Sequence, residues 1–440
     1  MPGANPQLHI RGLFHLDNIG NGDLPFIDAI FPDEIAFGRR NLRLQVDGVD
    51  VVPTGLPDAY QREQPNALRI PFDPPWVRKR VLELTIDYDL SSPQDSGSQI
   101  TLGPDNFHLS SRGWFPALQP PKHLFAPYPK RPKITTLTIR VPSGFLLLAR
   151  GTQKGTKKYA GETAFQFAVL RDDLPPYIVA GRYVTFPSKS DSHSAALWTL
   201  QPAKEDPQPA LNEITRAWKV LETDFGPIDR NISAPHIVES SELRGHTPGE
   251  QGPAATPFPG GVLVNPDAFA LGIGSDRFLE MITHSLAHNW FGDEMYPAAD
   301  AAIGMGEGLP EYATIVIEEA RNGPDGRRRR VARYLREYDE ARKNVDEEPL
   351  GATMLRDPVE KRRIAAAKAA LFFVALEDAC GEEPMRSGLR TMVTLLRGQE
   401  ASYDSLRSAL EQSSGKNLGE LFRVWLNAKG IPQDFRDRYQ

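Results

Sequence analysis

Two histidines four positions apart are the residues of this chain best placed to do chemistry. They stand in the run Met281-Ile-Thr-His-Ser-Leu-Ala-His-Asn-Trp-Phe-Gly. On a helix, His284 and His288 project from one face, so both imidazoles can reach a single ion. Glu307 follows after eighteen intervening residues, and a carboxylate one helix further on is the natural third ligand of a tetrahedral zinc site. The spacing is compatible with one zinc ion held by His284, His288 and Glu307, but two histidines on one helix face are by themselves more often structural, so the wider pattern must decide.

The residues around these three extend the pattern. His288-Asn-Trp-Phe-Gly and Glu307-Gly-Leu-Pro-Glu-Tyr resemble, with matching spacing, the signature of the aminopeptidase N-like zinc metallopeptidases, also called gluzincins or peptidase family M-one. Ser110-Ser-Arg-Gly-Trp-Phe-Pro is similar to a passage of that family's N-terminal β domain. The segment from Leu418 to Pro432 is similar to the last helix of its catalytic domain. The resemblance covers nearly the whole chain. It implies an antiparallel β-sandwich or saddle domain followed by a thermolysin-like, mainly helical domain.

The family's general base is missing from the motif. In the family a glutamate follows the first histidine, polarises the zinc-bound water and carries its proton to the leaving amine. Ser285 occupies that position here. Serine is a poor base near neutral pH, and His284 would be occupied by the metal, so a Ser–His nucleophile is not expected either. Loss of a general base removes roughly 10²–10⁴ in rate.

The oxyanion-stabilising tyrosine of the family also has no counterpart. The resemblance places Ala366 at the matching position, and no tyrosine occurs between Tyr338 and Tyr403. One oxyanion donor contributes about 10²–10³ in rate. Ordinary peptidase turnover is therefore not expected.

A third difference concerns recognition of the substrate. The family's loop that grips a free α-amino group corresponds to Gly260-Gly-Val-Leu-Val-Asn, so the resemblance implies substrate contacts from Gly260, Gly261, Val264 and Asn265. No acidic residue lies between Glu250 and Asp267. An amine anchor is therefore not expected at this loop.

Three readings of function follow from these differences. The first is a zinc-binding pseudo-peptidase, whose cleft binds a peptide or protein segment or whose zinc has a structural role. The alternative is an active zinc metallopeptidase or other hydrolase with a substitute base, for which Asp293, Glu294 and Glu311 are the nearby carboxylates. The third is a residual site that holds no metal.

Hydrophobic periodicity divides the chain into two expected domains. Residues 1–203 carry alternating runs at 41–46, 81–88 and 134–141, which predict strands of antiparallel sheets. A Pro-rich linker near 201–209 precedes helical periodicity from Ala210 onward, so residues 204–440 form the second expected domain. Arg244 to Pro259 is expected to be an exposed loop. Beyond it, helices are expected near 275–292, 307–322, 325–344, 357–380, 383–397, 402–412 and 417–429.

Composition excludes several function classes. The net charge is −6, from 51 basic and 57 acidic residues, which gives no electrostatic footprint for nucleic acid or an anionic membrane. Neither a signal peptide nor a transmembrane segment is expected. We therefore expect a soluble protein, and the sequence does not indicate its cellular compartment. Cys380, the only cysteine, is expected to be buried, and Arg327 to Arg330 are expected to form a salt-bridged helix face.

Overall fold

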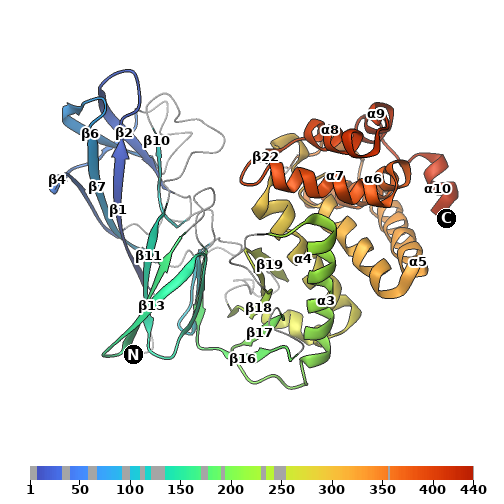
Figure 1. Ribbon diagram of the computed structural model, residues 1–440, viewed down its shortest axis with the longest axis horizontal. Coiled ribbons are helices and arrows are strands. Elements are labelled where there is room, and N and C mark those ends of the chain that lie inside the picture. Colours follow the sequence, from blue (N-terminus) through green and yellow to red (C-terminus); the bar gives the residue numbers. More distant parts are fainter. Residues whose placement is uncertain are drawn as a thin grey trace. The chain divides into compact units, whose positions relative to one another are not determined.

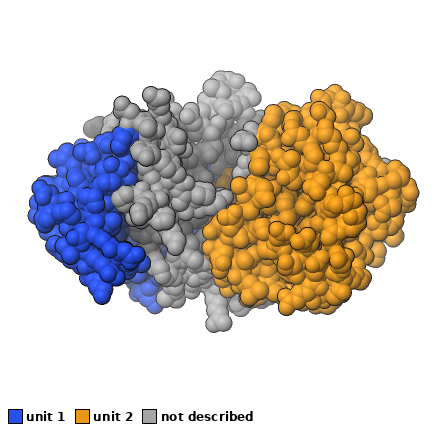
Figure 2. Space-filling model, turned by 90° about the horizontal axis from the view of Figure 1, so that it is seen from above, with its two compact units in different colours: residues 1–183, 240–253 blue, residues 184–239, 254–440 orange. Residues whose placement is uncertain are grey.

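The computed structural model describes residues 7–31, 40–57, 67–91, 100–109, 114–119, 134–169, 177–189, 194–228, 234–241, 254–354 and 357–439. The described residues do not include 110–113, the first four of the Ser110-Ser-Arg-Gly-Trp-Phe-Pro passage, or 244–253 of the expected loop. The chain divides into two compact units (Figure 2). Unit 1 comprises Met1–Tyr183 with Ser240–Pro253, and unit 2 comprises Val184–Glu239 with Ala254–Gln440.

Unit 1 is built from antiparallel strands, as its alternating runs predict. In β7 (Val81–Ser91) every second side chain from Leu82 to Leu90 is buried, because successive side chains of a strand point to opposite faces. The described strands form four sheets with the orders β1(Gln7–Asp17)-β7-β3(Arg40–Val46)-β4(Val49–Val51), β10(Ala117–Gln119)-β2(Leu24–Ile30)-β6(Ala67–Trp76)-β5(Thr54–Gly55), β11(Thr136–Pro142)-β14(Glu162–Ala168)-β13(Thr152–Tyr159) and β12(Leu146–Ala149)-β15(Ile178–Gly181)-β9(Asn106–Leu109)-β8(Ile100–Leu102).

Unit 2 contains a sheet that the sequence analysis did not predict. Its order is β16(Val184–Pro187)-β17(Ala196–Thr199)-β18(His236–Glu239)-β20(Gly261–Val264)-β19(Ala255–Phe258). The pairs β17–β18 and β18–β20 are parallel, and helix α3 (Gln208–Phe225) connects β17 to β18 (Figure 1). Each strand has only four residues, and a strand inside a parallel sheet is buried on both faces, so it lacks the alternation that identifies unit 1.

The division between the units differs from the expected domain boundary. We expected the boundary between residues 203 and 204, at the Pro-rich linker. The division instead falls between Tyr183 and Val184, because β16 and β17 pair with β18 in the sheet of unit 2. Segment 184–203 thus belongs to the second unit by its backbone pairing.

The helices of unit 2 follow the expected periodicity closely. One further helix, α10 (Gln433–Tyr439), was not predicted, because seven residues give too few turns for a periodic pattern. Three 3-10 turns (Pro266–Leu271, Ala299–Ala301, Leu350–Ala352) and a two-strand pair, β21(Tyr296–Pro297) with β22(Glu400–Ala401), complete the described elements. The other helices are α4(Asp276–Ala287), a π-helical turn (Asn289–Glu294), α5(Gly308–Ala341), α6(Val359–Cys380), α7(Glu382–Leu395), α8(Tyr403–Ser414) and α9(Gly419–Asn427).

Helix α5 reverses direction in its middle. Gly323 has non-helical dihedral angles (φ 68°, ψ −168°) and precedes Pro324. In a straight helix, Glu311 and Tyr334 would lie about 34 Å apart at 1.5 Å per residue, yet their side chains are hydrogen-bonded. The element is therefore a helical hairpin with arms at about 308–322 and 324–341, which the expected helices 307–322 and 325–344 anticipated.

Two smaller expectations from the sequence are confirmed. Cys380 is buried. Each of the four consecutive arginines, Arg327 to Arg330, forms an ion pair with a carboxylate. Among the described residues, no helix is long and apolar enough to cross a membrane.

Candidate metal centre

Helix α4 presents a polar stripe made of Glu280, His284 and His288. Ser275 caps its N-terminus by accepting a hydrogen bond from the backbone N–H of Phe278. The apolar side chains of the helix, Phe278 among them, pack into the core of unit 2, while the stripe at four-residue intervals faces the other way. The helix ends at His288. A π-helical turn follows, in which Asp293 N donates to the His288 carbonyl oxygen at 3.1 Å.

Glu307 is held at the N-terminus of α5 by close packing. Its backbone N–H donates to the Ile303 carbonyl oxygen at 3.1 Å, and Gly308 follows as the first residue of the helix. A Cβ atom at Gly308 would lie 2.4 Å from the Cβ of Ala369, so only glycine lets α5 approach α6 this closely. The close approach of the two helices therefore fixes the position of Glu307.

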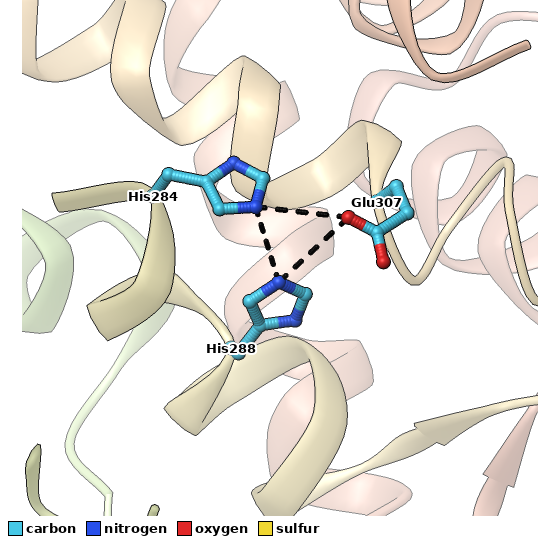
Figure 3. A group of neighbouring side chains, drawn as sticks. All are labelled: His284, His288 and Glu307. Atoms are coloured by element: carbon cyan, nitrogen blue, oxygen red, sulfur yellow. Dashed lines mark hydrogen bonds and ion pairs between the residues drawn. The ribbon is translucent and has the colours of Figure 1, made fainter. Parts of the chain in front are cut away.

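The three predicted ligands converge on one point (Figure 3). The His284 and His288 Nε2 atoms are 3.2 Å apart, and the Glu307 Oε2 atom is 3.6 Å from the first and 3.9 Å from the second. Ligand atoms of a tetrahedral zinc ion, at about 2.0–2.1 Å from the metal, lie about 3.3 Å from one another. The donor set and its spacing thus fit zinc.

The second carboxylate at the site belongs to Glu311. Its Oε1 atom lies 3.4 Å from His284 Nδ1, and its Oε2 atom accepts a hydrogen bond from the Tyr334 hydroxyl. A carboxylate at Nδ1 favours the proton on that nitrogen and leaves the Nε2 lone pair free for a metal. Glu311 therefore selects the tautomer of His284 that can bind zinc.

Charges at the site shift its pKa values strongly when no metal is bound. Burial alone would lower the pKa of His284, but the Glu311 and Glu307 carboxylates outweigh it and raise that pKa to about 10. Burial would raise the pKa of Glu307, and the two histidines outweigh it, so this pKa is lowered. The pKa of Glu311 is lowered too, because His284 and the Tyr334 hydroxyl outweigh burial. Two partly buried carboxylates that face the two histidines form an electrostatic arrangement suited to a divalent cation.

Ser285 lies on α4 beside the first histidine and is 5% exposed. Its side chain is a hydroxyl, which is a poor proton acceptor near neutral pH. The other two nearby carboxylates considered as substitutes are Asp293 and Glu294, of the π-helical turn. Glu294 is buried, and its Oε2 atom forms an ion pair with Arg397 Nε at 2.6 Å. Glu311 is engaged at both oxygens. Neither of these two glutamates is thus free to act as a base.

The predicted substrate-binding residues lie in and beside β20. Gly260 N donates to the Oδ1 atom of Asn289, which directly follows His288, at 2.5 Å. Gly261 and Val264 are the ends of β20, which is buried and paired with β18 and β19 on its two sides. Asn265 caps the following 3-10 turn. The backbone of Gly261 to Val264 is therefore committed to sheet partners. The described edge strand on this side is β19.

Two residues near the metal ligands were not singled out from the sequence. Asn289 is 1% exposed and joins the end of α4 to Gly260. Tyr334 reaches the site from the second arm of the α5 hairpin. A Gly323-Pro324 break between two helical patterns signals a reversal, but it does not show which residue of the second arm will meet Glu311.

Comparison with known proteins gives one family model and one curated relative. Residues 259–425 match the model of the Peptidase family M1 domain. A probable aminopeptidase 2 of Sulfurisphaera tokodaii is 24% identical over 174 residues, which are 36% of this chain and 20% of that protein. The matched stretch is thus about a fifth of the relative's length.

Solved structures share the fold over nearly the whole chain. An M1 zinc metallopeptidase from Deinococcus radiodurans has a TM-score of 0.66 at 18% identity, covering 97% of this chain and 91% of that one. A mutant of that enzyme bound to a Tyr-Ser-Ala substrate has a TM-score of 0.67 at 18% identity, covering 97% and 92%. Legionella pneumophila aminopeptidase A in complex with aspartic acid has a TM-score of 0.66 at 15% identity, covering 97% and 48%. The expected fold, a β domain followed by a mainly helical metallopeptidase-type domain, is confirmed.

Proposed function

We propose that this chain, which belongs to the M1 aminopeptidase-like family through its domain at residues 259–425, is a zinc-binding pseudo-peptidase. One zinc ion would be held by His284, His288 and Glu307, whose donor atoms lie 3.2–3.9 Å apart. When bound, zinc supplies a Lewis acid that polarises a carbonyl or lowers the pKa of water. The chain's own residues would orient the ligands and exclude solvent, without a base to take the proton.

Ser285 is the observation that carries this proposal. It stands at the position that the resemblance gives to the family's general base, and two of the three neighbouring carboxylates, Glu311 and Glu294, already face other side chains. Ala366, at the place that the resemblance gives to the oxyanion tyrosine, offers no hydroxyl. Both losses act on the transition state, so metal binding and the fold can persist after catalysis is gone.

A peptide is the ligand class that the fold supports. The Deinococcus radiodurans relative is described with a bound Tyr-Ser-Ala substrate. An extended peptide can add to a sheet only at an edge, where backbone groups are unpaired. The five-stranded sheet of unit 2 has edge strands β16 and β19, and β19 is the edge that pairs with β20 and its predicted residues. We propose that a peptide segment would lie along β19, while Gly260 and Asn265 shape the ends of β20.

The second candidate is a working metallohydrolase with a substitute base. The pairing of Glu311 with His284 and Tyr334 weighs against that residue, and the Arg397 ion pair weighs against Glu294. A carboxylate whose oxygens already face a cation or a hydrogen-bond donor is less available to accept a proton from a metal-bound water.

Metal content and activity test the proposal together. Purified full-length chain is analysed for zinc and screened against a broad set of peptides, beside His284→Ala and Ser285→Glu. We expect about one zinc per chain in the wild type, none retained by His284→Ala, and no turnover by the wild type.

Ser285→Glu restores the carboxylate in the position next to His284, so measurable hydrolysis by this variant alone would strengthen the proposal. Ser285→Gln is the matched control, because it has the same size without the base. Wild-type turnover that disappears in His284→Ala would establish the metallohydrolase instead, and a zinc-free wild type would overturn the metal site.

A further inference from the structure

The hairpin of α5 brings a buried tyrosine against the carboxylate that faces His284. Tyr334 lies on the second arm, is 3% exposed, and donates its hydroxyl proton to Glu311 Oε2. The other carboxylate oxygen, Oε1, faces His284 Nδ1 at 3.4 Å. A chain of three side chains thus runs from the second arm of α5 to the Nε2 atom that faces the metal position.

Thr314 holds the middle of this chain in place. Its Oγ1 atom lies 2.9 Å from the Tyr334 hydroxyl oxygen and 2.7 Å from the Glu311 carbonyl oxygen. Each hydroxyl has one proton, so Tyr334 donates to the Glu311 carboxylate, Thr314 donates to the Glu311 carbonyl oxygen, and the two hydroxyl oxygens lie in contact, a set that joins the two arms of the hairpin. In a buried site such a set restricts the rotation of the carboxylate.

A neighbouring ion-pair cluster fixes the register of the second arm against α4. Glu280 precedes His284 by one helical turn, as Arg330 precedes Tyr334. Arg330 Nη1 lies 2.5 Å from Glu280 Oε1, and Arg333 Nη1 donates to Glu280 Oε2 at 2.6 Å. Burial would raise the pKa of Glu280, but the two arginines outweigh it and lower that pKa. The second arm is thus anchored to the helix that carries the histidines.

From this geometry we propose that Tyr334 is a positioning residue of the metal site, acting through Glu311 on His284. Its hydroxyl holds the Glu311 carboxylate in the orientation that keeps the proton of His284 on Nδ1 and the lone pair on Nε2. Partners of this kind around metal ligands typically change metal affinity by about 10–100-fold. Removing the hydroxyl also leaves a buried carboxylate with one donor fewer. The inference rests on the proposed zinc site.

Zinc affinity measured in competition with a chromophoric chelator tests the role directly. Metal-free full-length wild type is compared with Tyr334→Phe and Glu311→Gln. Tyr334→Phe is expected to bind zinc roughly 10-fold more weakly. The visible spectrum of the cobalt-substituted protein is expected to change in the same variants, because it reports ligand orientation without requiring activity.

Tyr338→Phe is the matched control. Tyr338 lies one turn further along the same arm and is also buried, and its pKa is raised by burial and by Glu347, not by a residue at the metal site. Thermal unfolding of the metal-free variants separates affinity from general destabilisation. We expect similar melting temperatures for the two tyrosine variants and a zinc affinity that only Tyr334→Phe lowers.

A double variant decides whether Tyr334 acts through Glu311. If it does, adding Tyr334→Phe to Glu311→Gln costs little further affinity. Unchanged zinc affinity in Tyr334→Phe, or losses that simply add in the double variant, would overturn the inference while leaving the zinc site standing. A wild type that binds no zinc would overturn both.

Discussion

At the scale of single residues, three side chains with metal-binding groups converge beside a helix that carries a serine next to the first histidine. His284, His288 and Glu307 keep donor atoms at spacings that suit zinc, and Glu311 keeps His284 in the tautomer that binds. Under the proposed function, Ser285 replaces only the group that would act on a metal-bound water. The two carboxylates beside the histidines make the unmetallated site take up a proton in place of the cation, since their charge must be balanced.

The pH dependence of the metal-free protein follows from that proton. The folded pKa of His284 is raised to about 10, against an unfolded value near 6.5, so folding favours its protonated form. Its contribution to stability is fully present below the unfolded pKa and is lost as pH rises through the folded pKa. In chelator-treated protein, urea unfolding from pH 6 to 10 is expected to show stability falling in that window.

His284→Gln is the control for this measurement. It removes the titrating group but keeps a polar side chain of similar length, so its stability is expected to change less over the same range. Identical slopes in the wild type and in His284→Gln would contradict the assignment. Zinc-loaded wild type is expected to lose this dependence as well, because the metal replaces the proton.

At the scale of helices, the contact between α5 and α6 decides where Glu307 stands. Gly308 is the first residue of α5 and faces Ala369 and Phe373 of α6. The glycine is required by this close approach. The hairpin turn at Gly323 has a different role, since its positive φ lets the second arm return to the site.

Gly308→Ala is expected to destabilise the protein by about 1–3 kcal/mol, as overpacking in a core does. The added methyl group would lie 2.4 Å from the Cβ of Ala369. The helices must separate to accommodate it, which also displaces Glu307 and weakens zinc binding. Chemical denaturation and chelator competition measure the two effects.

Ala369→Gly offers a specific rescue. It removes the clashing atom, so the double variant is expected to recover part of the stability and of the zinc affinity lost in Gly308→Ala. If the two substitutions are instead additive, the Gly308–Ala369 contact does not position Glu307.

At the scale of the whole molecule, all three predicted ligands belong to unit 2. Unit 1 has its own hydrophobic core of strand residues, and the helices and five-stranded sheet of unit 2 share another. A ligand that binds only the folded state stabilises it by RT ln(1 + [L]/Kd), about 2.7 kcal/mol at a hundredfold excess over Kd. The stabilisation should act on the unit that contains the ligands.

Zinc removal is therefore expected to lower the stability of unit 2 selectively. Hydrogen exchange followed by mass spectrometry should show faster exchange in α4 and the first arm of α5 after chelation, while β7 of unit 1 changes little. His284→Ala should exchange alike with and without chelator. Equal acceleration in β7 and α4 would mean that the two units open together.

Local patterns in the amino-acid sequence were enough to predict most secondary-structure elements and the residues of the candidate metal site. Strands with one buried face are recognised by the alternation of apolar and polar residues, as in β7. Amphipathic helices such as α4 are recognised by apolar residues that recur every three or four positions. The strands of unit 1 and the helices of unit 2 were therefore predictable. The proximity of His284 and His288 was predictable because helical spacing places both on one face. The serine next to His284 could be read directly from the sequence.

Tertiary structure alone decided the rest. The short strands of unit 2 carry no period, and only their hydrogen-bonded neighbours move segment 184–203 into that unit. No local pattern tells that Tyr334 meets Glu311, since the contact joins residues 23 apart across the reversal at Gly323. The hydrogen bond of Glu311 with Tyr334 and the ion pair of Glu294 with Arg397 likewise join side chains that are distant in sequence. Local spacing thus fixes which groups share a face, whereas packing fixes what each group meets.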